Sequence, residues 1–267
     1  MRRETVTIGR KTLSYLIAEP SGPTVRQRPL GTVVLLHAFP LAAAMWEANL
    51  DSIPEGWRAI APDLRWEAGV MMNDLAGDVV DLLDHVGVPQ AAVVGCSMGG
   101  YVVFELLKSA PRYLSAIGLV STRPGADNEE GRRNRQKMIE LAGREGVAAV
   151  AAQMVPKLIG PTAARDRPGL VKLVERLAAA NTPDRIKAAI TAMMERSDST
   201  PLLARIDVPT LIVHGKEDVL IPSSEAEDMH RAIRHSQLEL IPFSGHLPNL
   251  EQPVPFDETL WQFLKKL

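Results

Sequence analysis

The segment Gly95-Cys96-Ser97-Met98-Gly99 places a serine between two glycines, a spacing at which serine can act as a nucleophile. It follows the apolar residues 91–94 and precedes a nearly all-apolar segment of helical length, residues 98–110. A sharp strand-to-helix turn would expose the serine hydroxyl, and the glycines leave room for the turn. The positive end of the helix would lie near a developing oxyanion. The pattern predicts that Ser97 is the nucleophile of an acyl-transfer reaction.

Two other interpretations of this turn stay open. It could be a glycine-rich turn that carries a surface serine, or a loop that binds phosphate. The second is weaker, because the segment has neither the G-x-G-x-x-G spacing nor the lysine of a P-loop.

A serine nucleophile needs a general base, and the base needs a carboxylate that orients it. For this motif the partners follow in the order serine, acid, histidine, which excludes His37 and His85 as the base. His246 lies in a Gly/Pro turn after an apolar segment, so it is the predicted base. The alternative is a loop histidine that only donates a hydrogen bond.

The predicted acid is Asp218, which follows the apolar segment 211–213 and precedes His246 by 28 residues. Two other carboxylates compete for this role: its neighbour Glu217, and Asp127 after the apolar segment 117–120. A turn carboxylate that caps the following helix is the non-catalytic alternative for Asp218.

Short apolar segments alternate with helical patterns along most of the chain, and this alternation predicts an α/β sheet. Residues 4–19 have the pattern of a hairpin. Continuous apolar runs typical of strands buried on both faces occupy residues 33–36, 58–61, 92–94, 117–120, 211–213 and 238–241. Helices are expected over residues 75–86, 98–110 and 254–267.

Residues 123–200 differ from the rest, because they have helical patterns, no clear strand and no Phe, Trp or Tyr. They carry 14 Lys and Arg against 10 Asp and Glu, whereas the rest of the chain carries 16 against 22. We expect a helical insertion between two strands; the alternative is a part of the core's own helix layer.

Composition excludes several classes of protein. The 267 residues have a formal net charge of −2, so nucleic acid is not an expected partner. The single cysteine, Cys96, cannot form an intrachain disulfide, and no secretory signal or membrane span is expected. The sequence therefore predicts a cytoplasmic protein. It also has no H-E-x-x-H and no paired C-x-x-C, so no catalytic metal and no cofactor are expected.

Together these motifs resemble the α/β-hydrolase superfamily, and especially small bacterial carboxylesterases and 3-oxoadipate enol-lactonase-like enzymes. The resemblance rests on residues 95–100, Gly215-Lys216-Glu217-Asp218 and Ser244-Gly245-His246, with support from residues 35–40 and 61–65. It implies an α/β-hydrolase fold: a mostly parallel eight-stranded sheet with an N-terminal antiparallel hairpin, flanking helices and a helical cap. Residues 1–122 and 201–267 would form the core domain, and residues 123–200 the cap.

The resemblance also implies roles for single residues. Ser97, His246 and Asp218 would be nucleophile, base and orienting acid, and the backbone N–H groups of Phe39 and Met98 would form the oxyanion hole. Ala38 stands where the family usually has glycine, so its Cβ would strain the loop if its φ were positive.

The predicted reaction is hydrolysis of short- to medium-chain carboxylic esters through an acyl-enzyme. The expected partners are therefore a small-molecule ester or lactone and water, with monomer and dimer both open. Candidate substrate-binding residues are Met138, Met154, Leu220 and Leu247. The alternatives are an enol-lactone or other lactone hydrolase, a C–C bond hydrolase, and a non-catalytic binding protein with the same fold.

Overall fold

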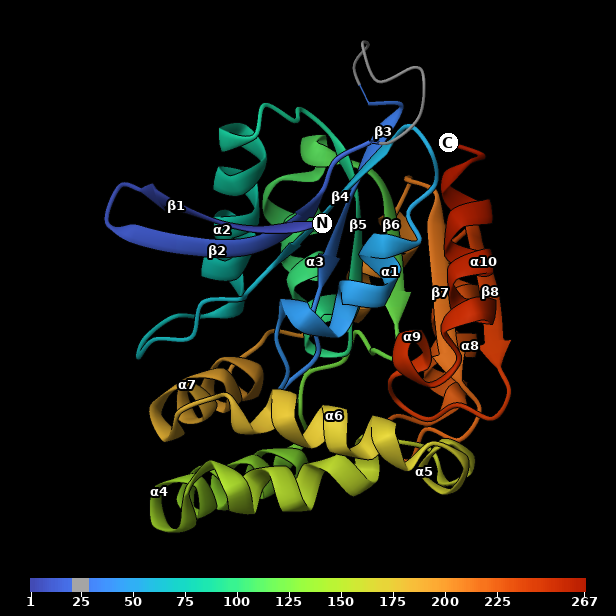
Figure 1. Ribbon diagram of the computed structural model, residues 1–267. Helices are drawn as coiled ribbons and strands as arrows, with labels where there is room; N and C mark the ends of the chain where they lie inside the picture. Colours follow the sequence, from blue (N-terminus) through green and yellow to red (C-terminus); the bar gives the residue numbers. More distant parts are fainter. Residues whose placement is uncertain (21–28) are drawn as a thin grey trace.

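A single eight-stranded sheet organises the chain in this computed structural model, which describes residues 1–20 and 29–267 (Figure 1). Its strand order is β1-β2-β4-β3-β5-β6-β7-β8. The first two strands form the expected hairpin, β2 also runs antiparallel to β4, and the remaining pairs are parallel. The strands are β1 (Arg2–Ile8), β2 (Lys11–Ala18), β3 (Gly31–Leu36), β4 (Trp57–Pro62), β5 (Ala91–Cys96), β6 (Leu114–Val120), β7 (Thr210–Gly215) and β8 (Ser236–Ile241).

Helices cover both faces of the sheet and bury its central strands. Every residue of β5 and β7 is buried. On one face the core includes apolar side chains of α2 (Met72–His85), α3 (Met98–Ser109) and α8 (Ser223–Ala232). On the other face it includes those of α1 (Glu47–Asp51), α9 (Pro248–Glu251) and α10 (Pro253–Leu264). Short 3-10 turns occupy Ala43–Trp46, Pro111–Tyr113 and Thr200–Arg205.

Strand β8 departs from the sequence prediction. Residues 238–241 were expected to be buried on both faces, but residues 236–240 alternate between half-buried and exposed side chains, and Ile241 alone in this strand is buried. The reason is its position, because β8 is an edge strand that pairs only with β7.

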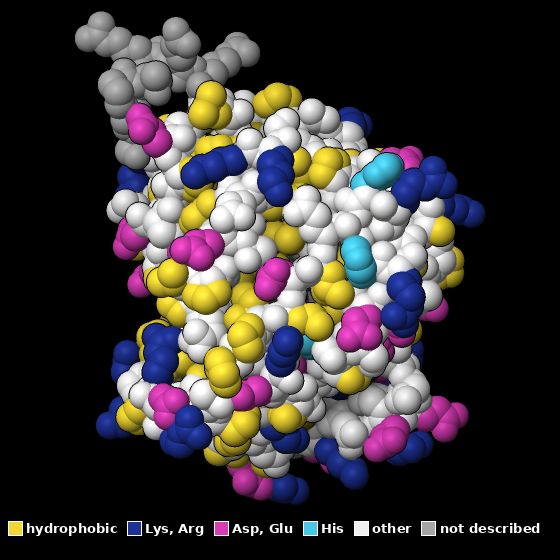
Figure 2. Space-filling model, turned by 90° about the vertical axis from the view of Figure 1, so that its right-hand side faces the viewer, with side chains coloured by type: hydrophobic (Ala, Val, Ile, Leu, Met, Phe, Trp, Pro, Cys, Tyr) yellow, Lys and Arg dark blue, Asp and Glu magenta, His cyan; other side chains and the backbone are white. Residues whose placement is uncertain are grey.

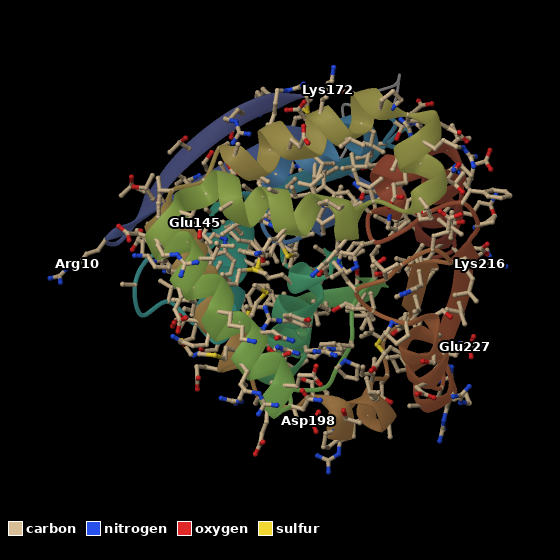
Figure 3. All side chains as sticks on the ribbon, turned by 90° about the horizontal axis from the view of Figure 1, so that it is seen from below. Arg10, Glu145, Lys172, Asp198, Lys216 and Glu227 are labelled. Carbon is tan, nitrogen blue, oxygen red and sulfur yellow. The ribbon has the colours of Figure 1, made fainter. Side chains whose placement is uncertain are left out.

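The chain between β6 and β7 forms four helices at the end of the sheet where the parallel strands finish (Figure 1). Viewed from below, α4 and α6 run side by side, while Arg10 at the hairpin tip points away from them (Figure 3). Helix α4 is broken at Gly146, where φ is 79°. The four helices are α4 (Glu129–Leu158), α5 (Pro161–Asp166), α6 (Pro168–Ala179) and α7 (Pro183–Met194).

The outer surface mixes side chains of both charges. Basic, acidic and hydrophobic groups are interspersed on the face that carries β8 and α10 (Figure 2). No helix in the described ranges combines the length and the apolar character needed to cross a bilayer.

The C-terminus of helix α2 is closed by backbone hydrogen bonds that depend on a glycine, Gly87. Its last turn closes with two hydrogen bonds, from Val88 N–H to the Leu83 carbonyl (2.9 Å) and from Gly87 N–H to the Asp84 carbonyl (3.2 Å). This closure requires a left-handed residue after the helix, and Gly87 has φ of 69°.

Replacing Gly87 by alanine should therefore destabilise the protein by about 1 kcal/mol, because an L side chain is strained at this φ. The matched control is Gly77→Ala in the interior of the same helix, which should stabilise by about 0.5–1 kcal/mol. A Cβ at either position would have no neighbour within 4 Å, so backbone conformation is the main difference. Urea unfolding measures both changes; equal effects would contradict this account.

Candidate active site

Ser97 lies in the turn between β5 and α3 with an unusual backbone conformation, φ 52° and ψ −111°. Two contacts with the neighbouring strand hold it there. Its N–H donates to the Val120 carbonyl (2.8 Å), and its own carbonyl accepts from the Thr122 hydroxyl (2.8 Å). A non-glycine residue at positive φ is strained, and such strain is common where a side chain must be presented for chemistry.

The turn requires glycine at positions 95 and 99, because neighbouring backbone atoms leave no room for a Cβ there. A Cβ on Gly95 would lie 2.3 Å from the carbonyl carbon of Gly99, and one on Gly99 would lie 2.4 Å from the carbonyl oxygen of Leu36. Both contacts are to backbone and cannot be relieved by a side-chain rotation. Cys96 beside the serine is fully buried, and burial raises the pKa of its thiol, so it is a packing residue.

The structure brings His246 and Asp218 together after β8 and β7. His246 Nδ1 lies 2.7 Å from Asp218 Oδ2. The other carboxylate oxygen accepts the N–H groups of Leu220 (2.8 Å) and Ile221 (3.1 Å). Burial acts to raise the pKa of Asp218, but His246 and the Ile221 N–H outweigh it, and the net shift is downward. The carboxylate is therefore ionised and fixes the imidazole with Nδ1 protonated.

A second histidine supports the same carboxylate. His214 Nε2 lies 2.9 Å from the Ile221 carbonyl and 3.5 Å from Asp218 Oδ2. Burial lowers the pKa of His214, which keeps it neutral, with the proton assigned to Nε2 by these two acceptors. Asp218 Oδ1 therefore accepts two backbone N–H groups, while Oδ2 faces His246 and, at a longer distance, His214.

Ser97 and His246 line one cavity of about 210 Å³. No hydrogen bond of 3.5 Å or less joins the serine hydroxyl to His246 in the described part of the chain. Such contacts often tighten only when substrate binds.

Two backbone donors come from different elements: Phe39 lies in the loop after β3, and Met98 directly follows the serine at the start of α3. Neither Phe39 N–H nor Met98 N–H has a hydrogen-bond partner within residues 1–20 and 29–267. His37 fixes this loop, since its Nδ1 lies 3.0 Å from the Ala38 carbonyl and its Nε2 accepts the Leu64 N–H at 3.0 Å. Ala38 does not have positive φ, so the expected strain at this position is absent.

Three of the four candidate substrate-binding residues line the cavity: Met138, Met154 and Leu220. Leu247 does not. Its side chain is fully buried in the core on the other side of the loop, because the chain turns there into α9.

The two rival carboxylates have other partners. Glu217 accepts the Thr162 N–H (2.9 Å) and the Thr162 hydroxyl (2.6 Å) at the start of α5. Asp127 lines the cavity, but three arginines bind its carboxylate. Neither hydrogen-bonds to His246 in the part of the chain that the structure describes.

Glu251 is a site residue that the sequence analysis missed. Its fully buried carboxylate accepts three backbone N–H groups, from Gly160 (2.7 Å), Gly245 (2.8 Å) and Leu247 (2.9 Å). Burial raises the pKa of Glu251, and these three N–H groups act against that rise. The detectable signal was a glutamate in the first turn of a helix that directly follows the histidine, since such a glutamate can reach back.

These contacts fasten the histidine loop to the end of α4. His246 N–H donates to the Leu158 carbonyl (3.2 Å), next to the Glu251–Gly160 contact. A Cβ on Gly245 would lie 2.4 Å from the Gly160 nitrogen, so the two segments are in direct backbone contact.

Comparison with known proteins identifies the class. A family model described as alpha/beta hydrolase fold matches residues 31–253, so the chain belongs to this family of hydrolases. The thermophilic esterase from Thermogutta terrifontis, solved with malate bound, superposes with a TM-score of 0.89 at 31% identity, covering 100% of this chain and 99% of that one.

Two lactonases are also similar. The 3-oxoadipate enol-lactonase 2 of Acinetobacter baylyi is 24% identical over 271 residues, which cover 99% of this chain and 97% of that protein. The enol-lactonase from Burkholderia xenovorans LB400 has a TM-score of 0.87 at 19% identity, covering 98% of this chain and 100% of that one, a likeness of fold.

Replacing Glu251 by glutamine should weaken the histidine loop. An amide has one acceptor oxygen, so at least one of the three buried N–H groups loses its partner, at a cost of about 1–3 kcal/mol. Thermal unfolding should show a lower midpoint than the native protein. Exposed Glu258 on α10 provides the control, and Glu258→Gln should leave the midpoint unchanged. An unchanged midpoint for Glu251→Gln would show that the carboxylate does not hold the loop.

Proposed function

We propose that the protein is a serine carboxylesterase that hydrolyses short- to medium-chain esters through an acyl-enzyme. One observation carries the proposal: the strained Ser97 shares a cavity with His246, whose Nδ1 lies 2.7 Å from the ionised Asp218. Binding alone requires neither a serine held at positive φ nor an imidazole oriented by a buried carboxylate.

In this mechanism the Ser97 hydroxyl attacks the ester carbonyl while His246 Nε2 accepts its proton. Asp218 stabilises the resulting imidazolium and keeps the ring oriented. The N–H groups of Phe39 and Met98, which have no hydrogen-bond partner among the described residues, would donate to the oxyanion, and the start of α3 would add its positive end. His246 then protonates the leaving alcohol. Water attacks the acyl-enzyme while His246 accepts its proton, and His246 returns that proton to Ser97 as the carboxylic acid is released.

Residues 123–200 act in this proposal as a cap over the serine. Their side chains Met138, Met154 and Met193 line the cavity together with Leu220. These flexible, apolar groups suit an aliphatic chain, and the small cavity favours short substrates.

A second candidate activity is hydrolysis of a lactone. It is favoured by the similarity to 3-oxoadipate enol-lactonases over nearly the whole chain. A lactone is a cyclic ester, so the same serine, histidine and oxyanion donors would open it.

The first test is the initial rate of hydrolysis of p-nitrophenyl acetate, butyrate and octanoate by the native protein and by Ser97→Ala. The native protein should prefer acetate or butyrate over octanoate. The variant should lose about 10⁴-fold or more in kcat, because the nucleophile is gone. Circular dichroism should confirm that the variant is folded.

Equal rates in the two proteins would overturn the proposal. Hydrolysis of enol-lactones by the native protein, without hydrolysis of the open-chain esters, would establish the lactonase instead. Failure of a fluorophosphonate to label Ser97 would favour a non-catalytic binding protein.

The adjacent carboxylates Asp218 and Glu217 allow a matched comparison. Asp218→Asn should lower kcat about 10⁴-fold, because the amide no longer fixes the required tautomer of His246. Glu217→Gln should keep kcat within a few-fold, because this side chain contacts α5 and not the histidine. Steady-state kinetics with p-nitrophenyl butyrate distinguish the two. A similar loss in both variants would contradict the assignment of Asp218.

A further inference from the structure

Three guanidinium groups meet a single carboxylate in the wall of the serine cavity. Asp127, whose side chain is 1% exposed, accepts from Arg123 Nη2 (2.8 Å) and Arg196 Nη2 (2.9 Å), and also from Arg135 Nε. The arginines come from the segment after β6, from α4 and from the segment after α7. One carboxylate neutralises one of the three charges, so this cluster has an excess of positive charge.

Arg196 turns both of its terminal nitrogens to partners within the protein, and only its buried Nε has no partner among the described residues. Its side chain is 3% exposed and lies over the Tyr101 ring, 4.1 Å from the ring centre. Besides Asp127, it donates to the carbonyls of Met193 (2.6 Å) and Gly125 (2.7 Å). Its role is to hold the loop before α4 against the end of α7.

Arg123 and Arg135 differ from Arg196, because both line the cavity and each keeps a terminal nitrogen without a partner among the described residues. Their side chains are 30% and 21% exposed. Arg123 gives only Nη2 to Asp127, and its Nε is buried without a partner among the described residues. Arg135 gives Nε to Asp127 and Nη1 to Met193 Sδ at 3.4 Å, which leaves Nη2 free within the described ranges.

No second acid compensates this charge inside the cavity. Asp127 is the one acidic residue among the described cavity-lining residues. Glu225 on α8 acts on Arg123 through its charge, but no described hydrogen bond joins their side chains. The face in Figure 2 mixes both signs, whereas here two guanidinium groups with donors unpartnered among the described residues line one cavity.

We infer that Arg123 and Arg135 form a carboxylate-binding subsite, so that the preferred substrate is a small ester that also carries an ionised carboxylate. The inference rests on the proposed function, since it takes Ser97 as the nucleophile in this cavity. A guanidinium fork binds a carboxylate through two directed hydrogen bonds. The methionines between would contact the aliphatic part that joins the ester to the carboxylate.

The test compares monomethyl glutarate, which is anionic at pH 7.5, with dimethyl glutarate, which has nearly the same shape and no charge. After correction for the two ester groups of the diester, native kcat/KM should favour the monoester by about tenfold or more. In Arg123→Gln and Arg135→Gln this preference should largely disappear, so that the ratio falls by about tenfold toward one, mainly through a higher KM for the monoester.

Arg132→Gln is the matched control. Arg132 lies on α4 three residues before Arg135, is paired with Glu195 and does not line the cavity. The ratio of kcat/KM for the monoester to kcat/KM for the diester in Arg132→Gln should equal that of the native protein. Arg135→Lys should recover only part of the preference, because lysine keeps the charge but not the planar fork.

The outcomes separate this inference from the proposed function. If p-nitrophenyl butyrate is hydrolysed but the native protein treats monoester and diester alike, the subsite is refuted and the esterase proposal stands. If the arginine variants lower kcat/KM equally for the monoester and the diester, the cluster is only structural and the inference also fails.

If no ester is hydrolysed, the proposed function fails. Calorimetry of glutarate binding to folded Ser97→Ala then decides the subsite by itself, since the inference requires weaker binding after Arg135→Gln.

Discussion

The backbone contact at Gly95 and Gly99 is the constraint on which the rest of the site depends. Strand β5 approaches α3 at Gly95, and the end of β3 approaches α3 at Gly99, so closely that neither position has room for a Cβ. The chain must therefore turn within one residue, and Ser97 takes a strained conformation that its neighbours hold in place. The same turn sets the start of α3, and with it the N–H of Met98, which has no partner among the described residues. A single steric constraint thus fixes the hydroxyl and one backbone donor together.

The sequence predicts the residues whose positions follow from where strands end. Ser97, Asp218 and His246 each follow an apolar segment, and parallel strands bring such ends to one edge of the sheet. The fold of the central strands is predictable for the same reason. The edge position of β8 is not, because burial depends on which strand lies beside it.

Contacts between distant loops could not be predicted from the sequence. Leu247 follows His246 directly, yet the turn into α9 sends its side chain into the core. Glu217 and Asp218 are neighbours with different partners, one on α5 and one on the histidine. Asp127 resembled a possible acid from its place after a strand, and only the structure shows the arginines around it.

The break of α4 at Gly146 divides that helix into two parts with different attachments. The part after Gly146 carries Met154 and ends at Leu158, where it is fastened to the histidine loop. The part before it carries Arg135 and Met138. The contacts to the histidine loop thus come from the part after Gly146, and the groups proposed to bind the substrate carboxylate come partly from the part before it. Under the proposed function, related chains could therefore differ in the substrates that they bind while their catalytic residues keep the same arrangement.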